Sequence, residues 1–162
     1  MSATETLENS HTKVIQALDD LPEAMWDMPG VSGDWSAKDV VAHLTSYELL
    51  LIDVLQAVQQ GTQPSPYVLR WNASLETFNQ EAVEARRYHT AQQVMNEYQD
   101  AQVRSTSELA SLPPEMLERK GTMPWYRSGE ASATELVERL GAHMNHHSEQ
   151  IVQFREAHKD SE

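Results

Sequence analysis

The sequence predicts an all-α protein built as a four-helix bundle, and three observations predict it. Apolar residues recur every three or four positions along four long segments. The boundaries of these segments are marked by Ser or Thr caps and by Gly or Pro stops. No stretch alternates polar and apolar residues with period two over a useful length, so no sheet is expected. The 162 residues fit one domain, residues 1–162, large enough to bury a real core.

The first two helices have clear boundaries. The first is predicted over Thr4–Leu21, and Pro22 follows it. After a loop over residues 28–35, Ser36 begins the second helix, with Asp39 three positions later in a capping-box arrangement. This helix is predicted to run to about residue 60 and to stop at Gly61.

The second half of the chain contains one short and two long predicted helices. A loop begins at Pro64, and a short helix follows over residues 74–87. The third long helix starts at Thr90 and ends before Pro113. After a loop over residues 121–129, Ser132 caps the last helix, with Glu135 completing a second capping box, and this helix reaches about residue 157. The two longest connections argue against a minimal up-and-down bundle.

The composition excludes several classes of function. Twelve basic residues face 25 acidic ones, giving a net charge of −13, which disfavours binding to nucleic acid and to anionic membranes. The chain has no cysteine, so it has no disulfide, no thiolate metal site and no thiol nucleophile of its own. The polar N-terminal stretch does not resemble a signal peptide, and we see no segment of roughly 18 apolar residues. We therefore expect a cytoplasmic protein.

Two histidines of the last helix share its buried face. At about 100° per residue, His147 falls in the middle of the apolar stripe, His143 at its edge and His146 outside it. Two inward imidazoles at positions i and i+4 can reach one metal ion. The stripe itself consists of Leu136, Val137, Leu140, Met144 and Ile151.

The second helix offers a third candidate ligand. His43 lies within its broad apolar face, and Glu48 also lies there, where a carboxylate is expensive unless it is paired. Spacing does not separate a metal site from hydrogen-bonded core histidines, because it does not show that the two helices touch. The remaining histidines, His11, His89 and His158, are predicted to be solvated.

Two segments resemble the signatures of the DinB/YfiT superfamily. Residues 33–44, GDWSAKDVVAHL, resemble the family's second-helix signature of a tryptophan, a Ser cap and a later His-Leu pair. Residues 143–151, HMNHHSEQI, resemble its last-helix signature, H-x-x-H-H-x-x-Q-I/L. Trp71, Asn72 and residues 78–79 are similar to the family's middle segment. The resemblance covers most of the chain and implies the DinB/YfiT type of four-helix bundle.

The resemblance also implies a divalent-metal site. Carried over by position, the ligands are His43, His143 and His147, and His146 matches a position that is usually not a ligand. Many members have an arginine where this chain has Ser148, so any role of that arginine is absent here. We expect nickel or zinc, with iron and manganese as alternatives, and the ligand set alone does not choose among them.

Three hypotheses of function remain open at this point. The first is a thiol S-transferase using bacillithiol, mycothiol or glutathione on an electrophilic small molecule, as in relatives. The second is a metal-dependent hydrolase, for which Glu48 and His146 are the candidate catalytic groups. The third is a stress-related ligand-binding module without enzymatic activity. Relatives also often pair as homodimers, and the sequence itself leaves the oligomeric state open. Three aromatic residues could line a substrate pocket or could simply pack in the core, namely Trp71, Trp125 and Tyr126.

Overall fold

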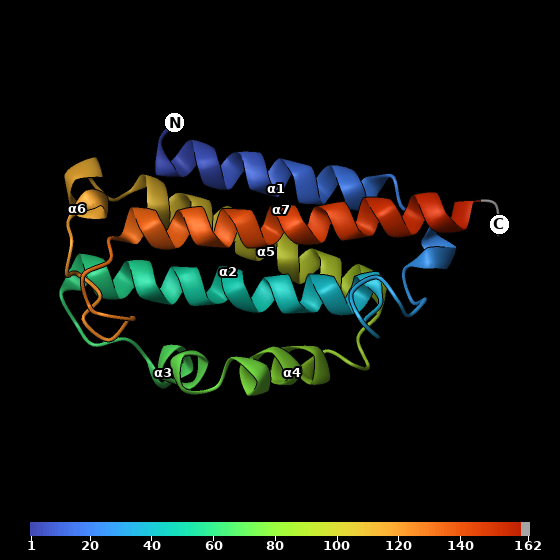
Figure 1. Cartoon of the computed structure of the whole chain (residues 1–162), viewed down its shortest axis with the longest axis horizontal. Helices are drawn as coiled ribbons and strands as arrows, with labels where there is room; N and C mark the ends of the chain where they lie inside the picture. Colours follow the sequence, from blue (N-terminus) through green and yellow to red (C-terminus); the bar gives the residue numbers. More distant parts are fainter. Residues whose placement is uncertain (160–162) are drawn as a thin grey trace.

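The structure, a computed structural model, describes residues 1–159, and four long helices run side by side along its longest axis (Figure 1). Three shorter helices and one 3-10 turn complete the described part. In chain order the elements are α1 (Ala3–Asp19), η1 (Glu23–Met25), α2 (Ala37–Gln60), α3 (Pro66–Ala73), α4 (Leu75–Ala85), α5 (Ala91–Ala110), α6 (Pro114–Glu118) and α7 (Ala133–His158).

The long helices pack as two pairs, α1 on α7 and α2 on α5. Within each pair the helices run in the same direction (Figure 1). This is possible because α3 and α4 carry the chain back along the outside of α2 before α5 begins. The predicted all-α four-helix bundle is confirmed, and the long crossover shows why it is not an up-and-down bundle.

The predicted helix starts are confirmed by their caps. Ser36 and Asp39 exchange both hydrogen bonds of a capping box at the start of α2. Thr90 and Gln93 do the same for α5. At α7 only half of the expected box is present, because Ser132 accepts from the amide of Glu135 and no reciprocal bond is formed.

Two short helices were not predicted from the sequence: α3 lies where a loop was expected, and α6 lies between the predicted third long helix and the predicted loop over residues 121–129. α3 begins at Pro66 and α6 begins at Pro114, and in both the proline occupies the first turn. Proline is favoured there because the first helical amide has no partner in the helix and the fixed φ suits the helix. Within residues 1–159 there is no strand, only an isolated bridge between Ser32 and Trp35.

Helix α2 forms the centre of the core. By length and composition it is apolar enough to cross a membrane, with a mean hydropathy of 1.3, which the sequence analysis did not recognise. Yet 83% of that apolar window is buried inside the bundle, against α4, α5 and α7. The apolar character of α2 is therefore accounted for by packing against its own neighbours.

A buried polar cluster joins α1, α2 and α5, and it corrects one prediction. His11, predicted to be solvated, is buried, and its Nε2 lies 2.6 Å from Oε1 of Glu48. Ser105 donates to the other oxygen of Glu48 at 2.5 Å. His89 is exposed, as expected, whereas His158 is half-buried with its ring stacked on Phe154. Glu48 is thus paired, which is how a carboxylate is tolerated at 3% exposure.

We predict that Glu48→Ala destabilises the fold by about 3–5 kcal/mol, because it leaves His11 and Ser105 buried without their partner. Urea unfolding followed by circular dichroism measures the change. The matched control is Glu8→Ala, which removes an exposed carboxylate from α1 and is expected to shift stability by less than about 0.5 kcal/mol. Equal urea midpoints for the two variants would contradict this role of Glu48.

Candidate metal centre

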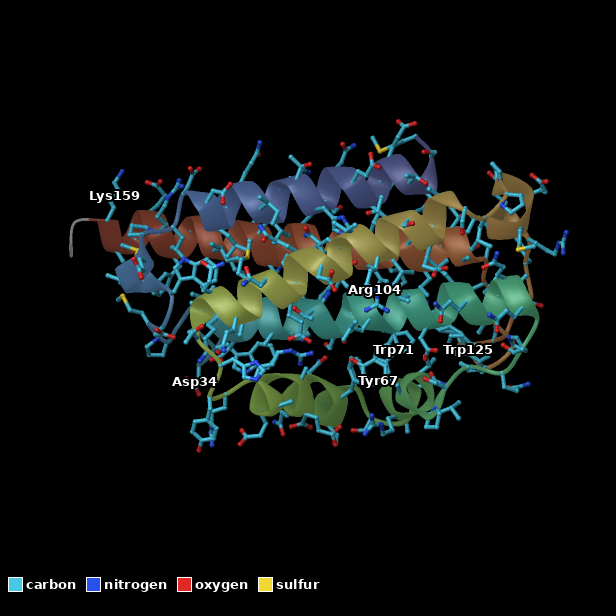
Figure 2. The ribbon with its side chains drawn as sticks, turned by 180° about the vertical axis from the view of Figure 1, so that it is seen from behind. Asp34, Tyr67, Trp71, Arg104, Trp125 and Lys159 are labelled. Atoms are coloured by element: carbon cyan, nitrogen blue, oxygen red, sulfur yellow. The ribbon has the colours of Figure 1, made fainter. Side chains whose placement is uncertain are left out.

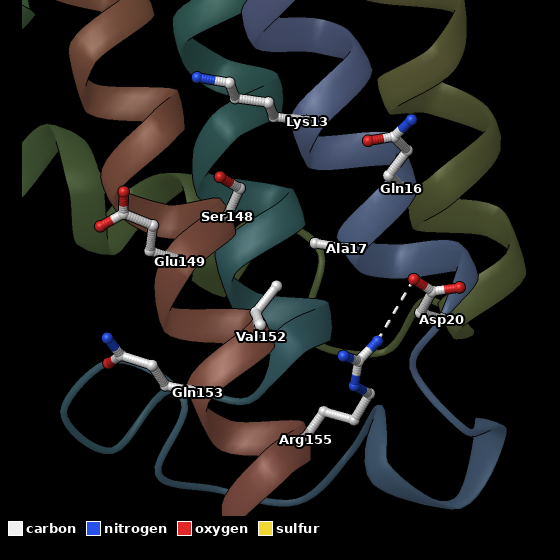
Figure 3. Close-up of a pocket in the computed structure, with 9 residues that line it drawn as sticks. All are labelled: Lys13, Gln16, Ala17, Asp20, Ser148, Glu149, Val152, Gln153 and Arg155. Carbon is white, nitrogen blue, oxygen red and sulfur yellow. Dashed lines mark ion pairs between the residues drawn. The ribbon is translucent and has the colours of Figure 1, made fainter.

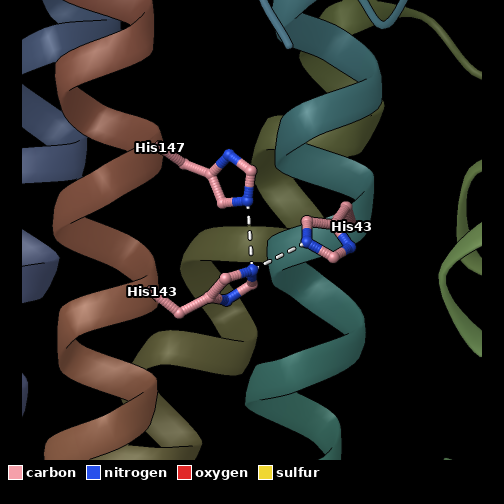
Figure 4. Close-up of side chains that lie close together, drawn as sticks. All are labelled: His43, His143 and His147. Atoms are coloured by element: carbon pink, nitrogen blue, oxygen red, sulfur yellow. Dashed lines mark hydrogen bonds between the residues drawn. The ribbon is translucent and has the colours of Figure 1, made fainter. Parts of the chain in front are cut away.

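Three histidines from two helices converge inside the bundle (Figure 4). His43 comes from α2, and His143 and His147 come from successive turns of α7. The Nε2 atom of His143 lies 3.0 Å from Nε2 of His43 and 3.0 Å from Nε2 of His147. One ring nitrogen from each residue lies within 4.8 Å of the others, so the three side chains could hold one metal ion.

The spacing of these nitrogens fits a shared ion. Two imidazole nitrogens bound to one ion at about 2.0–2.1 Å lie about 2.8–3.4 Å apart when the angle between them is about 90–110°. The two Nε2 separations of 3.0 Å agree with the lower end of that range. Two of the three pairwise separations therefore already suit a shared divalent ion.

The hydrogen bonds of the histidines also fit metal binding. Nδ1 of His147 lies 2.7 Å from Oε1 of Gln150, which can only accept, so Nδ1 carries the hydrogen and Nε2 presents a lone pair. Metal-binding histidines are usually oriented by such a partner on the other ring nitrogen. Nε2 of His143 cannot satisfy both neighbouring nitrogens with one hydrogen, whereas a cation between them would face three lone pairs.

Burial keeps the three imidazoles neutral. Burial, with the neighbouring imidazoles adding to it, lowers the pKa of His43 to about 2 and that of His143 to about 4. Burial also lowers the pKa of His147, opposed by its hydrogen bond to Gln150. Among residues 1–159, Nδ1 of His43 and Nδ1 of His143 have no hydrogen-bond partner. Metal binding through Nε2 places the hydrogen on Nδ1, and of the three histidines only His147 has a protein acceptor there in the described part of the chain.

The two candidate catalytic residues lie outside this cluster. Both oxygens of Glu48 are engaged by His11 and Ser105, and it makes no hydrogen bond to the three converging histidines. His146 is exposed, with its ring centroid 5.4 Å from that of His147. The helical positions predicted for α7 are confirmed, since His147 is buried, His143 is half-buried and His146 points outward.

A cavity of about 220 Å³ adjoins the histidines, with His143 in its wall. Of the three aromatic candidates, Trp71 and Tyr126 line it. Trp125 contacts Tyr126, with ring centroids 6.1 Å apart, but does not line the cavity. Figure 2 shows Trp71 and Trp125 at the same end of the bundle, where Asn72 of α3 donates to the carbonyl of Trp125 at 2.8 Å.

Sequence reasoning missed three polar residues of this cavity. Tyr47 donates to Asn79 at 2.8 Å, and Arg139 donates to the hydroxyl of Tyr126 at 2.5 Å. Burial raises the pKa of Tyr47, so the phenol stays protonated. Tyr47 follows His43 by four residues and Arg139 precedes His143 by four. That spacing places each one helical turn from a candidate ligand and was the signal that could have found them.

A second hollow lies elsewhere, between α1 and α7 (Figure 3). It measures about 370 Å³ and is open to solvent, and none of the three histidines lines it. Arg155 and Asp20 form an ion pair at 3.3 Å across it. This groove is therefore separate from the candidate metal centre.

Comparison with known proteins places the chain in a family without naming an activity. The family model of the DinB superfamily matches residues 6–151. A crystal structure of a structural-genomics target from Streptococcus pneumoniae superimposes with a TM-score of 0.77 at 16% identity. That match covers 95% of this chain and 88% of the other, and it supports the fold alone. No curated protein matches the chain.

We predict that the metal-free protein loses stability as the pH falls below the ordinary histidine value of 6.5. Below this pH the histidines of the unfolded chain bind protons, whereas those of the folded protein remain neutral. Their contribution to the free energy of unfolding is therefore complete above pH 6.5 and falls as the pH drops toward their lowered pKa values in the folded protein. Each histidine contributes a slope of at most about 1.4 kcal/mol per pH unit. Urea unfolding in a chelator at about pH 7 and about pH 5 measures the slope.

The control for this pH dependence is the double variant His43→Asn/His143→Asn, which removes the two most perturbed imidazoles. Its stability is expected to change less between the two pH values than that of the wild type. The same slope in both proteins would mean that the buried imidazoles do not titrate as their environment requires.

Proposed function

This chain belongs to the DinB superfamily, and we propose that its three converging histidines bind one divalent metal ion and serve to transfer a low-molecular-weight thiol to an electrophilic small molecule. The observation that carries the proposal is the convergence of three neutral imidazole nitrogens beside a cavity. Such a ligand set leaves further coordination positions for water or substrate, as catalytic sites require.

The donor set favours nickel or zinc. Neutral imidazole suits zinc, copper, iron and nickel, whereas carboxylate and water ligands suit magnesium, calcium and manganese. The candidate centre contains nitrogen donors only, and no Asp or Glu of the described residues belongs to it. Iron and manganese remain the alternatives that metal analysis distinguishes.

The chemistry of thiol transfer suits this cluster and this chain. A bound divalent ion would lower the pKa of a coordinated thiol, so that a nucleophile is available near neutral pH. The chain has no cysteine, so the thiol has to come from outside, as bacillithiol, mycothiol or glutathione. The rings of Trp35 and Tyr47 lie 5.0 Å from the ring of His43 and limit the access of water to that side of the cluster.

Hydrolysis, the alternative reaction, has less support. It needs a general base within hydrogen-bond reach of the reacting water. Glu48 is committed to His11 and Ser105, and His146 is exposed outside the cluster. A thiol attacks without such a base once it is deprotonated, so the residues around the histidines suit a thiol better than a water.

We predict near-stoichiometric nickel or zinc in protein purified without a histidine tag, measured by elemental mass spectrometry. His43→Ala, His143→Ala and His147→Ala are each expected to lower metal content at least about tenfold, since each removes one of three ligands. The matched control is His146→Ala, which removes an exposed imidazole from the same helix and leaves metal content unchanged. Wild-type protein that stays metal-free after loading with nickel or zinc would overturn the proposed site.

We predict turnover of a chromogenic aryl halide only when both metal and thiol are present. The three thiols are tested separately with wild-type protein and with the His143→Ala variant, which is expected to lose activity at least about a hundredfold. Metal-dependent ester hydrolysis without thiol would instead favour the hydrolase. Ligand binding without turnover of either substrate would favour the non-enzymatic module.

A further inference from the structure

The cavity beside the histidines has an apolar wall made largely of flat rings. Trp71 and Tyr126 stack with centroids 5.6 Å apart and an angle of 26° between their planes, so their rings form one continuous surface. Three leucines complete the apolar lining, namely Leu75, Leu136 and Leu140. The volume of about 220 Å³ lies below the range of about 300–1,000 Å³ found for drug-sized ligands. A small, flat molecule fits this space best.

The same cavity carries a cation that has no acidic partner. Arg139 also lines it and uses one N–H on the hydroxyl of Tyr126. Among residues 1–159, no carboxylate lies within ion-pair distance of Arg139, although the chain carries 25 acidic residues. A guanidinium has five N–H donors in a planar fork that matches a carboxylate, so four remain for a ligand.

Two more features add positive charge and hydrogen-bond donors near this cavity. The guanidinium of Arg127 lies 5.6 Å above the ring of Tyr126 and likewise has no carboxylate partner among the described residues. The indole N–H of Trp71 is buried without a hydrogen-bond partner; it lies near the hydroxyl of Tyr47 but outside hydrogen-bond geometry. A buried donor of this kind is costly unless a ligand or water accepts from it.

We propose that this cavity is a subsite for a planar organic carboxylate, held by Arg139 through its carboxylate group and by Trp71 and Tyr126 through its flat body. The inference rests on the proposed function in one respect: the bound acid is the electrophilic substrate, placed next to His143. The carboxylate could instead belong to the thiol, as in glutathione. The ring surface favours the flat acid, because a flexible polar thiol gains little from stacking on Trp71 and Tyr126.

The test compares benzoate with benzamide, its neutral analogue of the same shape, by calorimetry on metal-free wild-type protein. We expect benzoate to bind at least about tenfold more tightly than benzamide. In Arg139→Gln this preference is expected to disappear while the affinity for benzamide is unchanged. The matched control is Arg104→Gln, which removes the same charge from an exposed site on α5 outside the cavity lining and keeps the preference (Figure 2).

Three outcomes would overturn the inference: no binding of benzoate, equal binding of benzoate and benzamide, or a preference that survives in Arg139→Gln. Arg139-dependent binding of glutathione without binding of benzoate would also overturn it, by assigning the carboxylate to the thiol. Metal-free protein keeps this result separate from the proposed activity. If the protein binds benzoate but shows no thiol transfer, the carboxylate subsite stands and the transferase proposal fails. If it transfers thiol but does not bind benzoate, the transferase proposal stands and the subsite fails.

Discussion

The burial of α2 on nearly every side is the constraint on which the rest of the structure depends. This helix packs against α5, α7 and the crossover of α3 and α4, so its side chains have little access to water. A polar group in such a place is tolerated only when it finds a hydrogen-bond partner. Thr45 and Ser46 donate to carbonyls of α2 itself, whereas Glu48 is paired with residues of other helices.

His43 and Glu48 obey this constraint in different ways. Both oxygens of Glu48 are satisfied, by His11 and Ser105, so this cluster is closed and has nothing left to offer a ligand. His43 meets His143 instead, with their Nε2 atoms 3.0 Å apart, and burial keeps both imidazoles neutral by lowering the pKa of each. One partnership is complete within the protein, whereas the other could hold a metal ion. This difference in satisfaction separates a structural cluster from a candidate functional one.

Local patterns in the sequence predicted most of the fold. The predictions failed where such a pattern was misinterpreted, or where a feature depends on contacts between distant parts of the chain. Capping residues gave the starts of α2 and α5, and the single apolar stripe of α7 placed His143, His146 and His147 correctly. His11 was predicted to be solvated, yet its position among Leu7, Val14 and Leu18 at helical spacing indicates a buried face. Pro66 was taken to mark a loop and Pro114 the end of a helix, although proline suits a first helical turn. The contact of His43 with α7 is not a local property, so only the family resemblance predicted it.

The candidate site combines histidines from two core helices with cavity residues from segments outside the four-helix core. The ligand nitrogens sit on α2 and α7, two core helices whose positions are set by packing. Part of the cavity wall comes from α3, α4 and the segment around Tyr126, which lie outside the four-helix core, and α2 and α7 supply the rest. Peripheral segments tolerate substitution far better than core helices, because fewer buried contacts depend on them. If the proposed site binds a substrate, α2 and α7 would place the metal, and the peripheral segments together with Arg139 of α7 would help to determine which molecule fits. A shared fold consequently does not impose a shared substrate.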